Sequence, residues 1–182
     1  MTETKNYPPL IWLDLEMSGL DPDSERIIEI ATVVTNADLD EIKEGPNLVI
    51  RQPQEYIDGM DEWNLNQHSN SGLLDSLKAT QISVAEAEKQ TLDFLTKHVQ
   101  KGKSPLCGNS ISHDRRFLVR YMPELANFFH YRNVDVSSIK ELVKRWKPEL
   151  AVGIEKNGNH RALADVYESI KELKFYKDNL FN

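Results

Sequence analysis

The sequence of 182 residues contains one cysteine, Cys107, which excludes an intramolecular disulfide. It also lacks any run approaching the ~18 apolar residues that a membrane-spanning helix requires. The first ten residues are polar and contain no apolar core of the kind found in secretory signals. We therefore expect a soluble cytoplasmic protein with no membrane association, in which Cys107 is a small buried hydrophobic residue.

Basic residues are outnumbered by acidic ones, 22 against 29, which gives a net charge of -7. Tight binding of long nucleic acid depends on many Lys and Arg contacts to phosphates. The composition therefore argues against a clamp for long duplex nucleic acid. It is compatible with metal-binding carboxylates and equally with a solvated acidic surface.

The order of apolar segments predicts one domain over residues 1–182, of the α/β class. A turn rich in Gly, Pro and Asp, "SGLDPDS", joins the first two expected strands, so we expect these to be antiparallel. The expected fold is a mixed β-sheet flanked by α-helices. Strands are predicted over 9–15, 25–36, 47–53, 105–109 and 132–138, and helices over 83–100, 112–122, 138–146 and 161–176.

Two carboxylates stand one residue apart where the first apolar run ends, in "LIWLDLE". Residues two apart in a strand point to the same face, so Asp14 and Glu16 are expected to project from one spot. Unpaired, they would repel and raise each other's pKa, and a shared hard cation such as Mg²⁺ would remove the conflict. The alternative is a pair of exposed acids on an edge strand.

Three further candidates follow along the chain. Asp114 is expected near the start of a helix, where the helix dipole alone would also favour a carboxylate. His160 ends a loop rich in Gly and Asn, and Asp165 follows inside the first turns of the last helix. Taken alone, His160 is equally a surface or capping histidine. Together, four carboxylates and one histidine suit two-metal phosphodiester hydrolysis, in which His160 takes a proton from the attacking water.

Four segments resemble the histidine-containing branch of the DEDD exonuclease superfamily: "WLDLEMSGLDP", "CGNSISHDRRFLVRYMPEL", "YRNVDVSSIKEL" and "HRALADVYESIKELKFY". The resemblance implies a ribonuclease H-like fold, 3′→5′ hydrolysis of very short RNA and especially of dinucleotides, two Mg²⁺ or Mn²⁺ ions, and a homodimer. By this family's pattern, Asp14, Glu16, Asp114 and Asp165 hold the metals and His160 is the general base. The sequence leaves open whether pGpG is a main substrate.

The same resemblance implies how substrate length is measured. Leu20 and Trp63 would wedge against the two bases. The 5′-phosphate would be capped by Ser110, Arg132 and Ser137. Tyr131 would reach in from the partner subunit, and His68 is a weaker candidate for substrate binding. The alternatives are that Trp63 is a core or interface residue, that Arg132 is a surface residue, and that Ser137 is a helix N-cap.

Two other functions fit the same residues. A DNA-directed or proofreading 3′→5′ exonuclease of this fold would leave its groove open to longer substrates. A catalytically inactive nucleotide-binding module should have lost at least one of the five catalytic candidates. The complete set, together with the implied 5′-phosphate cap, favours an exoribonuclease acting on very short RNA.

Overall fold

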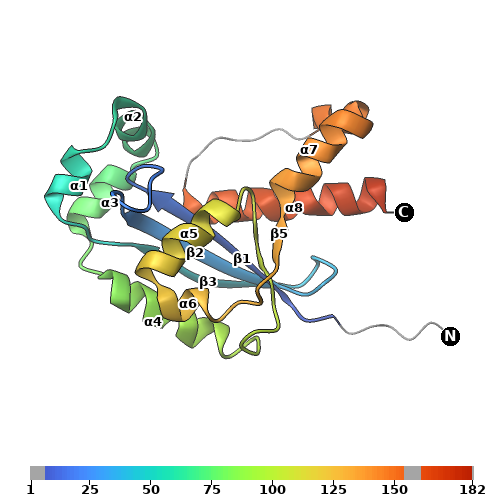
Figure 1. Ribbon diagram of the computed structural model, residues 1–182, viewed down its shortest axis with the longest axis horizontal. Helices are drawn as coiled ribbons and strands as arrows, with labels where there is room; N and C mark the ends of the chain where they lie inside the picture. The colour runs from blue at the N-terminus through green and yellow to red at the C-terminus, as the bar shows by residue number, and fades with distance from the viewer. Residues whose placement is uncertain (1–6, 154–160, 182) are drawn as a thin grey trace.

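The computed structural model describes residues 7–153 and 161–181, and five strands form one sheet in the order β3-β2-β1-β4-β5 (Figure 1). The central strand β1 pairs antiparallel with β2 and parallel with β4, so the predicted mixed sheet and the antiparallel first pair are confirmed. The strands are β1 (Leu10–Met17), β2 (Ile27–Thr35), β3 (Ile42–Val49), β4 (Leu106–Gly108) and β5 (Asn133–Asp135).

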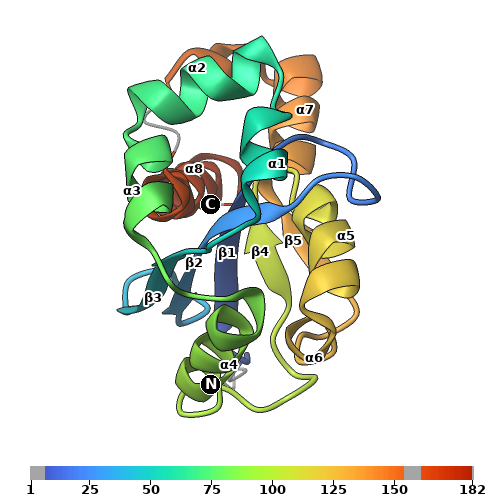
Figure 2. The ribbon, with the colours of Figure 1, turned by 90° about the vertical axis from the view of Figure 1, so that its left-hand side faces the viewer.

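Helices cover both faces of the sheet (Figures 1 and 2). They are α1 (Gln54–Asp58), α2 (Glu62–Asn70), α3 (Leu73–Ala79), α4 (Val84–Leu95), α5 (Ser112–Tyr121), α6 (Pro123–Ala126), α7 (Val136–Trp146) and α8 (Ala162–Leu180), with a 3₁₀ turn at Pro148–Gly153. Of the described residues, none belongs to a helix with the length and apolar character needed to cross a membrane.

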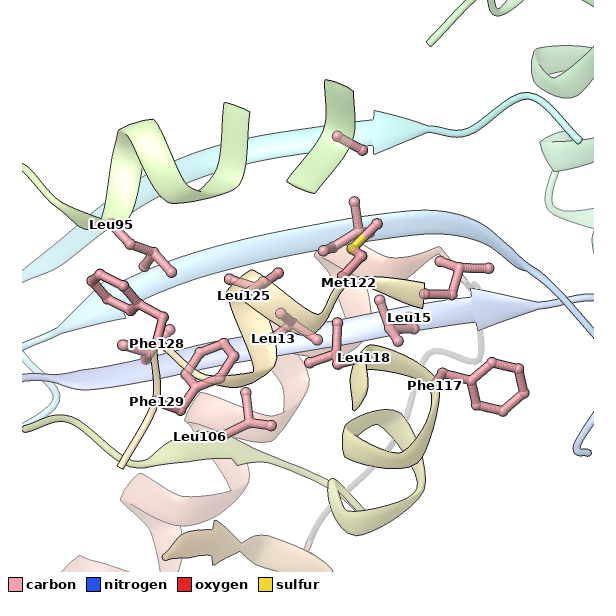
Figure 3. Close-up of a cluster of buried hydrophobic side chains, with 14 of the residues drawn as sticks. Leu13, Leu15, Leu95, Leu106, Phe117, Leu118, Met122, Leu125, Phe128 and Phe129 are labelled. Carbon is pink, nitrogen blue, oxygen red and sulfur yellow. The ribbon is translucent and has the colours of Figure 1, made fainter. Parts of the chain in front are cut away.

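Alternation along β1 divides the core between the two faces. Leu13 and Leu15 pack into a cluster with residues of α4, α5 and α6, as Figure 3 shows. Trp12 points the other way, into a cluster built from α7 and α8. Asp14 and Glu16 share the parity of Trp12, so they project on the face that α8 covers.

The predicted third strand, 47–53, is wrong in its bounds, because pairing runs over Ile42–Val49. The sequence of β3, IKEGPNLV, does not resemble a strand, because Gly and Pro disfavour strand pairing. Pro46 is tolerated here because β3 is an edge strand of the sheet. The three helices α1 to α3 were not predicted. Pro123 occupies the first position of the short helix α6, just after α5 ends.

Candidate active site

Three of the predicted carboxylates meet at the end of β1. Asp14 and Glu16 project from the strand, and Asp165 comes from the first turn of α8. One oxygen from each lies within 4.8 Å of the others. Their chemistry is that of a divalent metal site, because hard cations prefer carboxylate oxygens. Because β1 is the central strand, the edge-strand alternative for these acids is wrong.

Asp114 reaches the site past the end of β4. β1 and β4 are paired at Ile11 and Trp12, and β4 ends at Gly108. Farther along β1, the backbone N–H of Leu15 donates a hydrogen bond of 3.0 Å to Asp114 Oδ1. Asp114, in the first turn of α5 as predicted, thus lies against the residue between the two strand carboxylates.

Crowding and burial perturb the acids of this site. Burial, and then the charge of Asp114, raise the pKa of Asp14 well above its ordinary value. Burial followed by Asp165 raises the pKa of Glu16 to about 8. Burial also raises the pKa of Asp114 to about 7, against the lowering effect of its hydrogen bond from Leu15. Carboxylates in this state are energetically costly when ionised together, and a bound cation would relieve the cost.

A buried ion pair that the sequence did not reveal fixes α8 beside these acids. Glu29 on β2 stands opposite Glu16 in the strand register, and its side chain is fully buried. It accepts hydrogen bonds from Arg161 Nη2 at 2.7 Å and Nε at 3.0 Å, and from the Ala162 backbone N–H at 3.0 Å. Since the N–H of Asp165 bonds to the Arg161 carbonyl, this carboxylate anchors the turn that presents Asp165.

The two predicted base wedges are exposed. Leu20 is 72% exposed in the turn after β1, and Trp63 is 64% exposed on α2. His68 differs from them, because it is 2% exposed. Its Nε2 donates to the Met17 carbonyl at 3.0 Å, and its Nδ1 lies 4.0 Å from Glu16 Oε2. The structure therefore places His68 between α2 and the end of β1 rather than on the surface.

The turn that holds Leu20 is pinned to α5. Tyr121 donates its hydroxyl to the Pro22 carbonyl at 2.8 Å, and Arg120 forms a 2.7 Å ion pair with Asp23. Arg26 donates to Tyr121 and lies 3.9 Å from the centre of the Tyr56 ring. These contacts fix the position of the turn that carries Leu20 relative to α5, the helix that carries Asp114.

The two serines predicted for the phosphate cap meet at the carboxyl ends of β4 and β5. Ser110 Oγ lies 3.2 Å from Ser137 Oγ, and the Ser110 N–H donates to Ser137 Oγ at 3.0 Å. The alternative of Ser137 as N-cap is wrong. Asp135 caps α7 instead, accepting the N–H of Ser137 at 2.9 Å and that of Ser110 at 3.0 Å.

Tyr131 and Arg132 lie at the other end of β5. In the register of the parallel pair, Asn133 is level with Leu106 and Asp135 with Gly108. At ~3.3 Å per residue, this strand separates Arg132 from the serines by about 10 Å. The Arg132 guanidinium lies over the exposed ring of Tyr131, 4.8 Å from its centre. The two side chains thus pack on each other at the start of β5.

Comparison with known proteins identifies the family. The RNase T exonuclease family model matches residues 11–173. A protein named oligoribonuclease from Bordetella pertussis is 57% identical over 175 residues, covering 96% of this chain and 97% of the relative. Another oligoribonuclease, from Nitrosomonas europaea, is 56% identical over 173 residues, covering 95% of this chain and 96% of the relative. This chain belongs to the oligoribonuclease family of exonucleases.

Solved structures support the fold of this oligoribonuclease family member. Exonuclease I superposes with a TM-score of 0.72 at 18% sequence identity, over 94% of this chain and 41% of that chain. Its zinc-bound complex with single-stranded DNA, from E. coli, gives a TM-score of 0.73 at 17% identity, over 97% of this chain and 42% of that one. The chain therefore spans about two fifths of exonuclease I, and the likeness confirms the ribonuclease H-like exonuclease fold.

Of the five predicted catalytic residues in this family member, His160 lies outside the described residues. The structure brings Asp14, Glu16 and Asp165 together and sets Asp114 beside them. Sequence reasoning missed the residues that hold these groups in place, Glu29 above all. Its only signal was a glutamate inside the otherwise apolar run "IIEIA".

Proposed function

We propose that this protein hydrolyses short RNA from the 3′ end, with 5′-phosphorylated dinucleotides as its preferred substrates. The observation that carries the proposal is the approach of Asp14, Glu16 and Asp165 to within 4.8 Å, in a chain 57% identical to an oligoribonuclease. The composition agrees with it, since a net charge of -7 suits a small substrate better than a long polyanion.

In this proposal Asp14, Glu16, Asp114 and Asp165 hold two Mg²⁺ or Mn²⁺ ions. The raised pKa values support the fit, because closely packed, buried carboxylates need a countercharge. Bound ions would supply an activated water and a charge that stabilises the leaving oxygen. Asp114 keeps Oδ1 on the Leu15 N–H, which orients its carboxylate toward the strand acids. His160 accepts the proton of the attacking water.

The exposed hydrophobic residues and the serines would measure the substrate. Leu20 and Trp63 contact the bases. These contacts tolerate any of the four bases, because stacking needs only a π-face. Ser110 and Ser137 bind the 5′-phosphate and close the groove after two nucleotides. His68, being buried, supports this arrangement by joining α2 to the end of β1. A short site with few phosphate contacts implies a shallow salt dependence of binding.

Arg132 completes the cap on the 5′-phosphate together with the serines, and Tyr131 reaches in from the partner subunit of a homodimer. Arg132 offers bidentate donors suited to a phosphate. The Tyr131 side chain is exposed and so available to a second copy.

Turnover against RNA length, from two to seven nucleotides, with a DNA duplex end for comparison, tests this function. We expect the 5′-phosphorylated dinucleotide to be cleaved fastest. Equal or faster cleavage of the 7-mer or of DNA would favour the DNA-directed or proofreading alternative.

The Asp14→Ala variant tests the role of the acids, with Asp75→Ala, an exposed surface acid, as the control. Loss of a group that stabilises charge in the transition state costs about 10²–10³ in rate. An Asp14→Ala protein that kept full hydrolysis would refute the two-metal mechanism. A wild-type protein that binds dinucleotides with Mg²⁺ but hydrolyses nothing would be an inactive binding module.

A further inference from the structure

A buried carboxylate lies behind the two cap serines, in a place that the hydrolytic mechanism does not use. Glu172, on α8, has a fully buried side chain. Its Oε1 accepts from Lys140 Nζ at 2.7 Å and from the Tyr176 hydroxyl at 3.0 Å, and its Oε2 accepts from Asn109 Nδ2 at 3.2 Å. Both oxygens are therefore engaged, and among the described residues Lys140 is the cationic partner of this charge.

Asn109 connects this carboxylate to the cap. Its Nδ2 also donates to Ser169 Oγ at 2.8 Å, and its Oδ1 accepts the hydroxyl of Ser137 at 3.0 Å. An ionised carboxylate can only accept hydrogen bonds, so the side of the amide that faces Glu172 must be the NH₂ group. The carbonyl oxygen is then the side that faces Ser137.

The orientation of the Asn109 amide decides which hydrogen bonds Ser137 and Ser110 can make. Ser137 gives its one hydroxyl proton to Asn109, and its oxygen accepts from the N–H and the hydroxyl of Ser110. The Ser110 hydroxyl is then the serine donor that can rotate from Ser137 toward a phosphate. Ser110 itself has φ of 51°, a left-handed conformation that is costly for a residue other than glycine. Such a conformation persists only where its surroundings fix it, and here Ser137 and Asp135 bind its N–H.

We propose that Glu172, acting through Asn109, is a positioning residue for recognition of the substrate's 5′-phosphate. This role rests on the proposed phosphate cap and adds a residue that does not touch the substrate. A buried ion pair of this kind is weak evidence for stability, since apolar replacements are often as stable. Its use here is to allow one orientation of the Asn109 amide and so one arrangement of Ser137 and Ser110.

The test compares KM and kcat for dinucleotides with a 5′-phosphate and with a 5′-hydroxyl. In Glu172→Gln the side-chain oxygen stays toward Lys140, which can only donate, so the NH₂ group faces Asn109 and favours the reversed orientation of the Asn109 amide. We expect the preference for the 5′-phosphate, measured in KM, to fall about tenfold, comparable to one hydrogen bond to a charged group. The kcat values and the KM for the 5′-hydroxyl substrate should stay within about twofold, which a general loss of structure would not allow.

Two more variants isolate the path of the effect. Asn109→Leu should lose the same preference, and adding Glu172→Gln to it should cause no further loss, because both changes interrupt one connection. A further loss in that double variant would mean that the effect follows another route, such as the freed Lys140 charge, and would overturn the proposal.

Glu141→Gln is the matched control, because Glu141 is an exposed, ion-paired glutamate next to Lys140 on α7. It should keep the wild-type preference. A Glu172→Gln protein that also keeps it would overturn the role of Glu172 while leaving the cap intact. A wild-type protein without any preference for the 5′-phosphate would overturn the proposed cap and this role with it.

Discussion

The backbone N–H of Leu15 donates a hydrogen bond to Asp114 Oδ1 across 99 residues of sequence, at 3.0 Å. β1 extends past Gly108, where β4 ends, so the Leu15 amide between the two strand carboxylates bonds to a side chain. A helix from the middle of the chain thus supplies both the hydrogen-bond acceptor and a fourth acid.

The stability of the protein without metal should fall as the pH rises. The pKa of Glu16 is raised to about 8 from an ordinary 4.5, and that of Asp114 to about 7 from 3.8. Between the unfolded and folded pKa values, the folded state keeps protons that the unfolded state has released, so raising the pH favours unfolding. Each group contributes up to about 1.4 kcal/mol per pH unit.

Urea unfolding at pH 5.5 and pH 8, in EDTA and in saturating Mn²⁺, would measure this linkage. We expect lower stability at pH 8 in EDTA, and a stabilisation by Mn²⁺ that is larger at pH 8 than at pH 5.5. Equal metal-free stabilities at the two pH values would show that these acids are not perturbed as described.

Removing the buried partner of Arg161 should destabilise the fold. Glu29→Ala leaves a guanidinium and the Ala162 N–H without their acceptor, and breaking a buried pair costs about 3–5 kcal/mol. Because Arg161 is 31% exposed, we expect the lower end of this range. The control is Arg145→Ala, which breaks an exposed pair with Glu141 and should cost about 0–1 kcal/mol. Chemical denaturation gives both values, and similar losses in the two variants would contradict the anchoring role.

Truncation of the wedge should affect substrate binding and not folding. Trp63→Ala should raise KM for dinucleotides by a factor that corresponds to about 1–3 kcal/mol of binding free energy, the range for one stacked base. The melting temperature should change little, because the side chain is 64% exposed. Trp146→Ala, a change at a tryptophan 72% exposed on α7, is the control and should leave KM unaltered. An unchanged KM in Trp63→Ala would exclude this residue from base contact.

Arg132 should contribute to recognition of the 5′-phosphate. Arg132→Ala is expected to weaken cleavage of 5′-phosphorylated dinucleotides by about 1.5–3 kcal/mol, and cleavage of longer RNA far less. A uniform loss across RNA lengths would mean that Arg132 is structural.

Tyr131 should act on the site of the partner subunit, and mixed dimers of Tyr131→Ala with Asp14→Ala test this. If Tyr131 acts across the interface, one site per mixed dimer has intact acids and an intact Tyr131, so activity recovers toward half of wild type. If it acts within its own chain, the mixture stays as inactive as its components.

Several features of the site were predictable because they depend on local sequence. The period of a strand sets Asp14 and Glu16 on one face, and the chain order of strand, turn and helix places Asp114 in the first turn of α5. The early position of Asp165 on the last helix followed in the same way. The bounds of the edge strand β3 were misplaced because strands are recognised by their buried apolar residues, and most of the β3 side chains are exposed or only partly buried.

The sequence by itself determined the identity and order of the acids, the α/β class and the family, since motif spacing and strand period are local properties of the chain. Tertiary structure alone decided how these groups are held. The pairing of Glu29 with Arg161 joins residues 132 apart, and the connection from Glu172 through Asn109 to Ser137 spans α8, the end of β4 and α7. Such contacts depend on how strands and helices distant in the sequence pack against one another, and no local sequence pattern encodes this packing.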